Sequence, residues 1–193
     1  MKRITLFAIA ALFTGSLFAQ NVENENLSDQ SIDIRKGYIG ITFGPAFPTG
    51  DIDNDAISGG AHLNIANFGY LLSEHVGIAA TWFGTSFYSK YDSKTSLGLG
   101  GIMVGPLLST ASQSRKVEYD LKTMIGFANG TLIEDNETSS SSRALALGIG
   151  GAVRWNCWKK FSLSCGIDYY NSKPESINLS SYAFVIGVNY RLK

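Results

Sequence analysis

The chain has 193 residues, no formal net charge at pH 7 and a mean hydropathy of +0.05. These values predict one domain and give no basic surface for nucleic acid, which excludes a nucleic-acid-binding protein from our hypotheses. They do not exclude a membrane protein, because each strand of a transmembrane barrel turns a polar face inward that balances its lipid-facing side.

The first residues have the three parts of a secretory signal peptide. Lys2 and Arg3 form a basic start, residues 4–13 are apolar, and small residues precede a cleavage site after Ala19. The apolar run is much shorter than the roughly 20 residues of a membrane-spanning helix. We therefore predict a signal peptide over 1–19 and export of the mature chain.

A polar segment at 20–36 is predicted to be flexible and to lie in the periplasm. From 37 to 193, Gly, β-branched and aromatic residues alternate without a helical period, which predicts a single β-domain. It divides into eight strand candidates, each near the roughly 9–11 residues that a tilted strand needs to cross a membrane. The candidates are 38–47, 60–72, 76–88, 95–107, 117–128, 143–155, 161–171 and 178–192.

Two unlike faces alternate most clearly along 117–128, 143–155 and 178–192. One face is bulky and apolar, and the other carries glycines, alanines and isolated charges. A soluble barrel of the lipocalin type, which is the rival fold, would place the bulky apolar face inside. The pattern therefore predicts an eight-stranded antiparallel up-and-down transmembrane β-barrel with a narrow, polar lumen.

The predicted connections alternate in length, and the longer ones follow the odd-numbered strands. Long loops face outward in such barrels, and an even strand number returns both ends to the periplasmic side. The segment 129–142 is predicted to be the longest outer loop and a candidate contact site. The inner turn 108–116 is predicted to be longer than this pattern favours.

Aromatic residues are predicted to form two girdles at the membrane interfaces. The periplasmic girdle would contain Tyr38, Tyr70, Trp155, Trp158, Phe161 and Tyr190. The outer girdle would contain Phe47, Phe87, Tyr88, Phe127, Tyr169, Tyr170 and Tyr182.

Four segments carry a resemblance to a known group of proteins. They are GYIGITFGPAFPTGD (37–51), NFGYLLSEHVGIAATW (67–82), GGAVRWNCWKKFSLSCGIDY (150–169) and YAFVIGVNYRLK (182–193). Together they resemble the small outer-membrane β-barrels of Gram-negative bacteria, the OmpA/OmpX-like group, although this chain ends on Lys193 where such barrels often end on an aromatic residue. The resemblance implies contact with outer-membrane lipid, lipopolysaccharide and the assembly machinery of that membrane.

Six charged residues are predicted to form a network in the lumen. They are Glu118, Asp120, Lys122, Arg154, Asp168 and Arg191. The connection between their strands should bring Glu118 opposite Arg154. The network could gate a polar path for small solutes or simply fill the barrel, and filling is favoured because eight strands leave an interior just wide enough for side chains.

The cysteines and histidines indicate no further chemistry. Cys157 and Cys165 are too far apart along the expected ladder for a disulfide, so both are predicted to be free thiols. His75 falls in an inner turn and His62 at the outer end of its strand, so we expect no shared metal and an exposed His62. No catalytic residue, cofactor or metal site is predicted.

Three hypotheses for function remain. The first is a non-enzymatic structural or surface-interaction protein that contacts surface or host ligands through its outer loops. The second is a narrow channel for ions or small solutes. The third is a lipid-A-modifying enzyme that would use His62 together with a serine at the level of the outer leaflet, although no residue spacing supports it.

Overall fold

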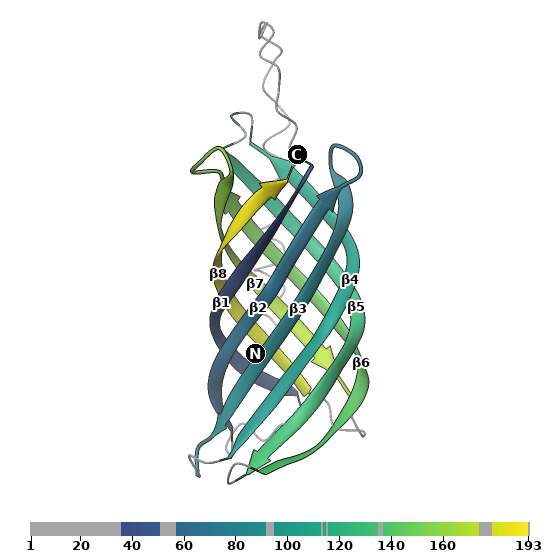
Figure 1. The fold of residues 1–193 in the computed structure, drawn as a ribbon, viewed down its shortest axis with the longest axis vertical. Coiled ribbons are helices and arrows are strands. Elements are labelled where there is room, and N and C mark those ends of the chain that lie inside the picture. Colours follow the sequence, from purple (N-terminus) through teal and green to yellow (C-terminus); the bar gives the residue numbers. More distant parts are fainter. Residues whose placement is uncertain are drawn as a thin grey trace, which may run out of the picture. The chain divides into compact units, whose positions relative to one another are not determined.

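The computed structural model describes residues 36–50, 57–91, 95–112, 114, 116–134, 137–173 and 179–192, with the side chains of 50 and 132–142 left out. In this part of the chain, eight strands form a closed antiparallel barrel in sequence order, and β1 pairs with β8 to close it (Figure 1). The predicted fold is confirmed. The strands are β1 (Gly37–Gly50), β2 (Ile57–Leu71), β3 (Val76–Ser89), β4 (Ser96–Ala111), β5 (Val117–Glu134), β6 (Glu137–Trp155), β7 (Phe161–Ser172) and β8 (Leu179–Leu192).

The barrel has two unlike ends. At the terminal end, Gly37 of β1 pairs with Leu192 of β8, and the turns 72–75, 112–116 and 156–160 connect the strands. At the opposite, distal end, β5 and β6 continue beyond the other strands and are separated only by 135–136. The predictions for 1–35, including the signal peptide, lie outside the described residues.

Two predicted connections are wrong, because both are shorter in the structure than the sequence indicated. Most of 129–142 belongs to β5 and β6, and the ladder between them continues to the pair Glu134 and Glu137. The turn predicted at 108–116 starts only at 112, because β4 runs to Ala111. The prediction stopped both strands where the apolar alternation stops, but a ladder needs only backbone hydrogen bonds and can continue with polar residues beyond the membrane.

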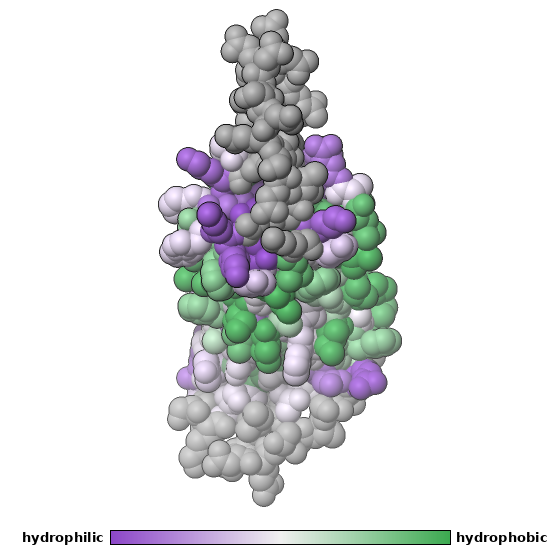
Figure 2. Space-filling view, turned by 45° about the horizontal axis from the view of Figure 1, so that its top comes forward, coloured by the Kyte–Doolittle hydropathy of each residue, from purple (hydrophilic) through white to green (hydrophobic). Residues whose placement is uncertain are grey.

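The outer face of the barrel is an apolar belt between two polar ends (Figure 2). Outward side chains such as Trp82, Ile125 and Phe184 are about half exposed. A soluble protein rarely leaves so many large apolar groups in contact with water, whereas lipid favours them. Within the described ranges, no helix is both long and apolar enough to cross a membrane.

The inner face is small and polar along the strands for which alternation predicted it. Asp120 and Lys122 of β5, Arg154 of β6 and Asn189 of β8 are all buried in the lumen. On β2 the pairing with β3 shifts between Asn64 and Ala66, so the inward positions change parity there. Such a bulge re-aims every side chain that follows it.

The predicted aromatic girdles are only partly correct. Tyr38, Phe87 and Tyr170 are at most 3% exposed and point into the lumen, so they belong to neither girdle. Their positions have inward parity: Tyr38 alternates with the outward Ile39, and Tyr170 lies two residues from the buried Asp168. Inside the barrel, these rings fill volume that the glycine-rich walls leave open.

Candidate functional site in the barrel lumen

The first charged cluster of the lumen is centred on Arg154 of β6. Its Nε and Nη2 atoms donate to the two carboxylate oxygens of Asp120, at 2.6 and 3.1 Å. Nη2 also lies 2.7 Å from Oε2 of Glu118, which is the direct register partner of Arg154. The guanidinium carbon lies 4.0 Å from the centre of the Tyr38 ring, and Arg191 reaches the other Glu118 oxygen at 3.6 Å.

The second cluster is centred on Asp168 of β7. Lys122 Nζ lies 3.1 Å from Oδ1 and 3.3 Å from Oδ2 of this carboxylate. Tyr170 Oη donates to Oδ2 at 3.1 Å, and Asn64 Nδ2 approaches the same oxygen at 3.4 Å. The structure thus divides the six predicted charges into two groups, with Lys122 and Asp168 separate from the other four.

A glycine makes the second cluster possible. A Cβ atom at Gly150 would collide with the Asp168 carboxylate and with the aliphatic stem of Lys122. Gly150 is the register partner of both Lys122 and Asp168, and it lies between them on β6. The missing side chain therefore provides the space in which the lysine and the carboxylate meet across one strand.

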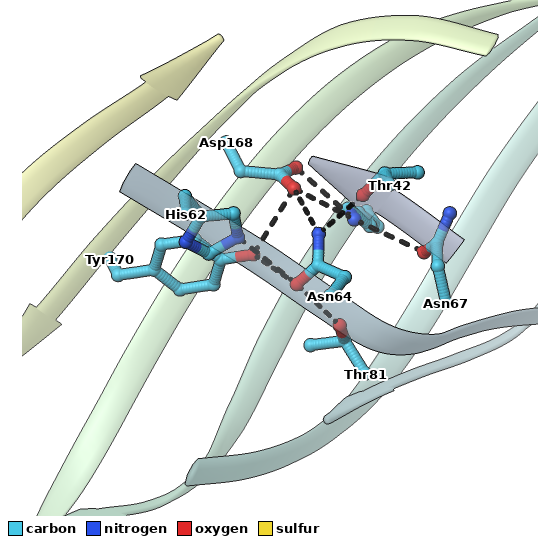
Figure 3. Close-up of polar contacts among 8 residues, drawn as sticks. Thr42, His62, Asn64, Asn67, Thr81, Asp168 and Tyr170 are labelled. Carbon is cyan, nitrogen blue, oxygen red and sulfur yellow. Dashed lines mark hydrogen bonds and ion pairs between the residues drawn. The ribbon is translucent and has the colours of Figure 1, made fainter. Parts of the chain in front are cut away.

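Asn64 links this cluster to the neighbouring strands β1 and β3. Its Nδ2 donates to Thr42 Oγ1 at 2.8 Å, while its Oδ1 accepts from Thr81 Oγ1 at 3.0 Å. His62 Nε2 lies 3.1 Å from the same Oδ1 (Figure 3). Sequence reasoning missed Asn64 because the bulge on β2 hides the alternation that would have placed it inside.

His62 is buried, so the expectation of an exposed histidine is wrong. Its ring stacks on Tyr170 with centroids 5.0 Å apart, and Tyr170 stacks on Phe83 at 4.4 Å. His62 Nδ1 also lies 2.7 Å from Thr85 Oγ1. The three rings form an aromatic stack, hereafter His62–Tyr170–Phe83, that crosses the lumen beside the Asp168 cluster.

The lumen offers little room around these side chains. The pocket beside Arg154, Arg191 and Glu118 has a volume of about 10 Å³, which is the space of about one water molecule. The three carboxylates of the two clusters balance three cations, so the interior carries no excess charge that would attract ions of one sign. This arrangement can hold the strands in register.

Comparisons with known proteins support the same fold. No protein-family model and no curated protein matches this chain. Among solved structures, Neisserial surface protein A is similar with a TM-score of 0.66 and 16% identity, over 81% of this chain and 97% of that one. The chain has the fold of a small outer-membrane barrel.

Two further structures are similar at lower TM-scores. The attachment invasion locus protein Ail of Yersinia pestis has 16% identity and a TM-score of 0.49, over 81% of this chain and 99% of that one. The barrel domain of OprF from Pseudomonas aeruginosa has 12% identity and a TM-score of 0.46, over 81% of this chain and 100% of that one. The likeness to Neisserial surface protein A confirms the resemblance found in the sequence as a likeness of fold.

The apolar belt and the fold together place this barrel in the bacterial outer membrane. In such barrels the chain ends and short turns face the periplasm. The terminal end with Gly37 and Leu192 is then periplasmic, and the distal end of β5 and β6 faces outward. The Arg154 cluster lies toward the periplasmic end, and most of the buried apolar side chains lie toward the outer end.

The remaining candidate residues of the barrel are the two cysteines and His62. Cys157 and Cys165 are free thiols, as predicted, and Cys165 faces outward opposite Val153. In the described ranges, no group of three or more His, Cys, Asp or Glu side chains is arranged to hold a metal ion. His62 is enclosed by Tyr170 and Phe83, so it cannot reach a lipid of the outer leaflet.

Proposed function

We propose that this outer-membrane barrel is a non-enzymatic surface-interaction protein whose contact region is the outward projection of β5 and β6. The observation that carries the proposal is an unpaired strand edge. β7 pairs with β6 only from Ala146 onward, where Ala146 meets Ser172. Among the described residues, no strand pairs with 137–145 on that side, although these residues are paired with β5 on the other.

An exposed strand edge is a template for another extended chain. Its free N–H and C=O groups can form a ladder with an incoming segment, and side chains then set the specificity. The edge over 137–145 spans nine residues, which at roughly 3.3 Å per residue gives about 30 Å of backbone. This length is ample for an added strand, because strands in globular proteins commonly have about five or six residues.

The filled lumen supports the same proposal. The paired charges around Arg154 and the aromatic stack occupy the interior, which disfavours the channel as the main function. The buried position of His62 disfavours the lipid-modifying enzyme. The projecting hairpin is the part of the described chain that an external ligand can approach.

The test compares the intact protein with a variant that lacks the edge. A short turn would replace 132–141, which trims both strands and leaves the membrane-spanning ladder intact. Both proteins would be displayed on a Gram-negative laboratory strain, with folding checked by gel mobility, and attachment to surfaces coated with purified extracellular-matrix proteins would be measured. We expect attachment by the intact protein and its loss in the trimmed variant.

A matched control separates the edge from general effects of display. Lys160→Gln changes an exposed cation at the periplasmic end and should leave attachment unchanged. Equal attachment by the intact and trimmed proteins, or no attachment by either, would contradict the proposal.

A further inference from the structure

The outer wall of the barrel has a notch in its apolar belt. It is a shallow, open depression of about 380 Å³, and its exposed lining is almost entirely apolar. It lies over β2, β3 and β4, in the half of the barrel toward the outer end. The outward residues that line it are Ala61, Leu63, Gly84, Ser86, Gly98, Gly100 and Thr131.

The register explains why the wall is thin at this place. Gly84 of β3 pairs with Gly100 of β4, and Ser86 pairs with Gly98 in the next outward row. The row on the other side is bulky, because Trp82 pairs with Ile102 there. A Cβ atom added at Gly84 would meet nothing within 4 Å, so the missing side chain opens a real hollow above a ridge.

A cation lies at the side of this hollow. Gly100 pairs with Asn129 of β5, and Asn129 pairs with Arg143 of β6, so one cross-strand row runs from Gly84 to Arg143. Arg143 is exposed on the outer face and lies two strands from Gly100, which at roughly 4.8 Å per strand is about 10 Å. An arginine side chain can cover much of that distance.

The geometry points to a lipid site: one acyl chain of a phosphorylated outer-leaflet lipid lies in the notch, with its phosphate at Arg143. The notch continues the lipid-facing belt, so lipid is the solvent that reaches it. Apolarity alone favours no occupant, because lipid tails are as apolar as leucine. The hollow and the guanidinium together select a flexible chain that carries an anionic head, since arginine binds phosphate with two parallel hydrogen bonds.

A second copy of the chain fits this surface less well. A two-fold dimer presents the same patch on both subunits. Two notches facing each other would leave a void in the interface, which close packing disfavours. Arg143 also belongs to the 137–145 edge of β6. The trimmed variant that lacks 132–141 keeps Arg143 and the notch, and so either proposal can fail alone.

The test is native mass spectrometry of the full mature protein released from nanodiscs that contain purified lipid A. We expect one lipid A retained by the natural sequence and its loss in Gly84→Leu, whose new side chain fills the hollow. Arg143→Gln should lower retention about tenfold, the usual effect of losing a charge-assisted hydrogen bond. With dephosphorylated lipid A, Arg143→Gln should make no difference.

Matched variants make the result decisive. Ala80→Leu adds the same bulk to an outward position of β3 outside the notch, and Lys160→Gln removes a cation at the other end of the barrel. Both should retain the lipid. Gly98→Leu fills the notch from β4 and replaces Gly84→Leu if gel mobility shows that the latter does not fold.

Three outcomes would overturn the inference. The first is retention that filling the notch does not change. The second is equal loss of lipid in Ala80→Leu or Lys160→Gln. The third is a dimer that Gly84→Leu dissociates, because it would assign the notch to a second copy of the chain.

Discussion

The two halves of the lumen are filled by different chemistry. Toward the periplasm, Arg154 is held by two carboxylates and a tyrosine ring. Toward the outside, apolar side chains such as Phe87 are buried beside neutral polar ones such as Ser181 and Thr85. In an apolar interior, the free-energy cost of a substitution grows with the volume of the cavity that it leaves. An ion pair that loses one partner instead leaves a buried charge, which costs more. The comparison predicts that single substitutions cost most in the periplasmic half.

The largest effect is expected at Asp120. Asp120→Ala removes the carboxylate that accepts two hydrogen bonds from Arg154, and it leaves Glu118 alone to balance Arg154 and Arg191. The free energy of unfolding should therefore fall by about 3–5 kcal/mol. Urea unfolding in lipid vesicles, followed by tryptophan fluorescence, measures this change. The double variant Asp120→Leu, Arg154→Leu should cost much less, and an equal cost for both variants would refute the role of the unpaired charge.

A smaller effect is expected in the apolar half. Leu99 of β4 is 3% exposed and belongs to the buried apolar cluster of the lumen. Leu99→Ala should lower the free energy of unfolding by about 2–3 kcal/mol through lost packing. A loss larger than that of Asp120→Ala in the same urea titration would reverse the proposed ranking of the two halves.

Gly150→Ala tests the close contact between Lys122 and Asp168 in the second cluster. The added methyl group must displace Asp168 or Lys122, which should lower the free energy of unfolding by about 1–3 kcal/mol. Gly151→Ala is the matched control, because a Cβ there would meet only a carbonyl oxygen at 3.9 Å. Equal unfolding midpoints for the two variants would show that the lysine and the carboxylate can separate freely.

The smallest effect is expected at Arg191. Its Nη2 lies 3.6 Å from Glu118, and both side chains are partly exposed at the end of the barrel. Arg191→Gln should lower the free energy of unfolding by about 1 kcal/mol, because this ion pair is long and partly reached by water. A loss as large as that of Asp120→Ala would mean that Arg191 is part of the central network.

The same comparison explains what the sequence could predict. Uninterrupted alternation on β5, β6 and β8 predicted the barrel and the inward face of Asp120, Lys122 and Arg154. The bulge between Asn64 and Ala66 interrupts the alternation on β2, and therefore His62 and the aromatic stack were missed. The length of β5 and β6 was missed for another reason, because hydropathy indicates only the part of a strand that touches lipid.

The sequence did contain a signal for some of the residues that the prediction placed wrongly. Tyr38 shares its parity with Thr42 and Ala46, all of them buried, while the odd-numbered residues between them face outward. The prediction weighed the preference of aromatic rings for interfaces above this alternation. The division of the six charges into two clusters had no such signal, because it depends on which side chains the closed barrel brings together.

The central claim is that the lumen is closed and that contact takes place at the outer rim. Single-channel recording in planar lipid bilayers, with the natural sequence and Arg154→Ala side by side, tests it most directly. We expect no steady ion-conducting openings in the natural protein, and in Arg154→Ala a loss of stability without a conducting state. Steady openings of the natural protein that Arg154→Ala enlarges would contradict the claim and make the charge network a gate.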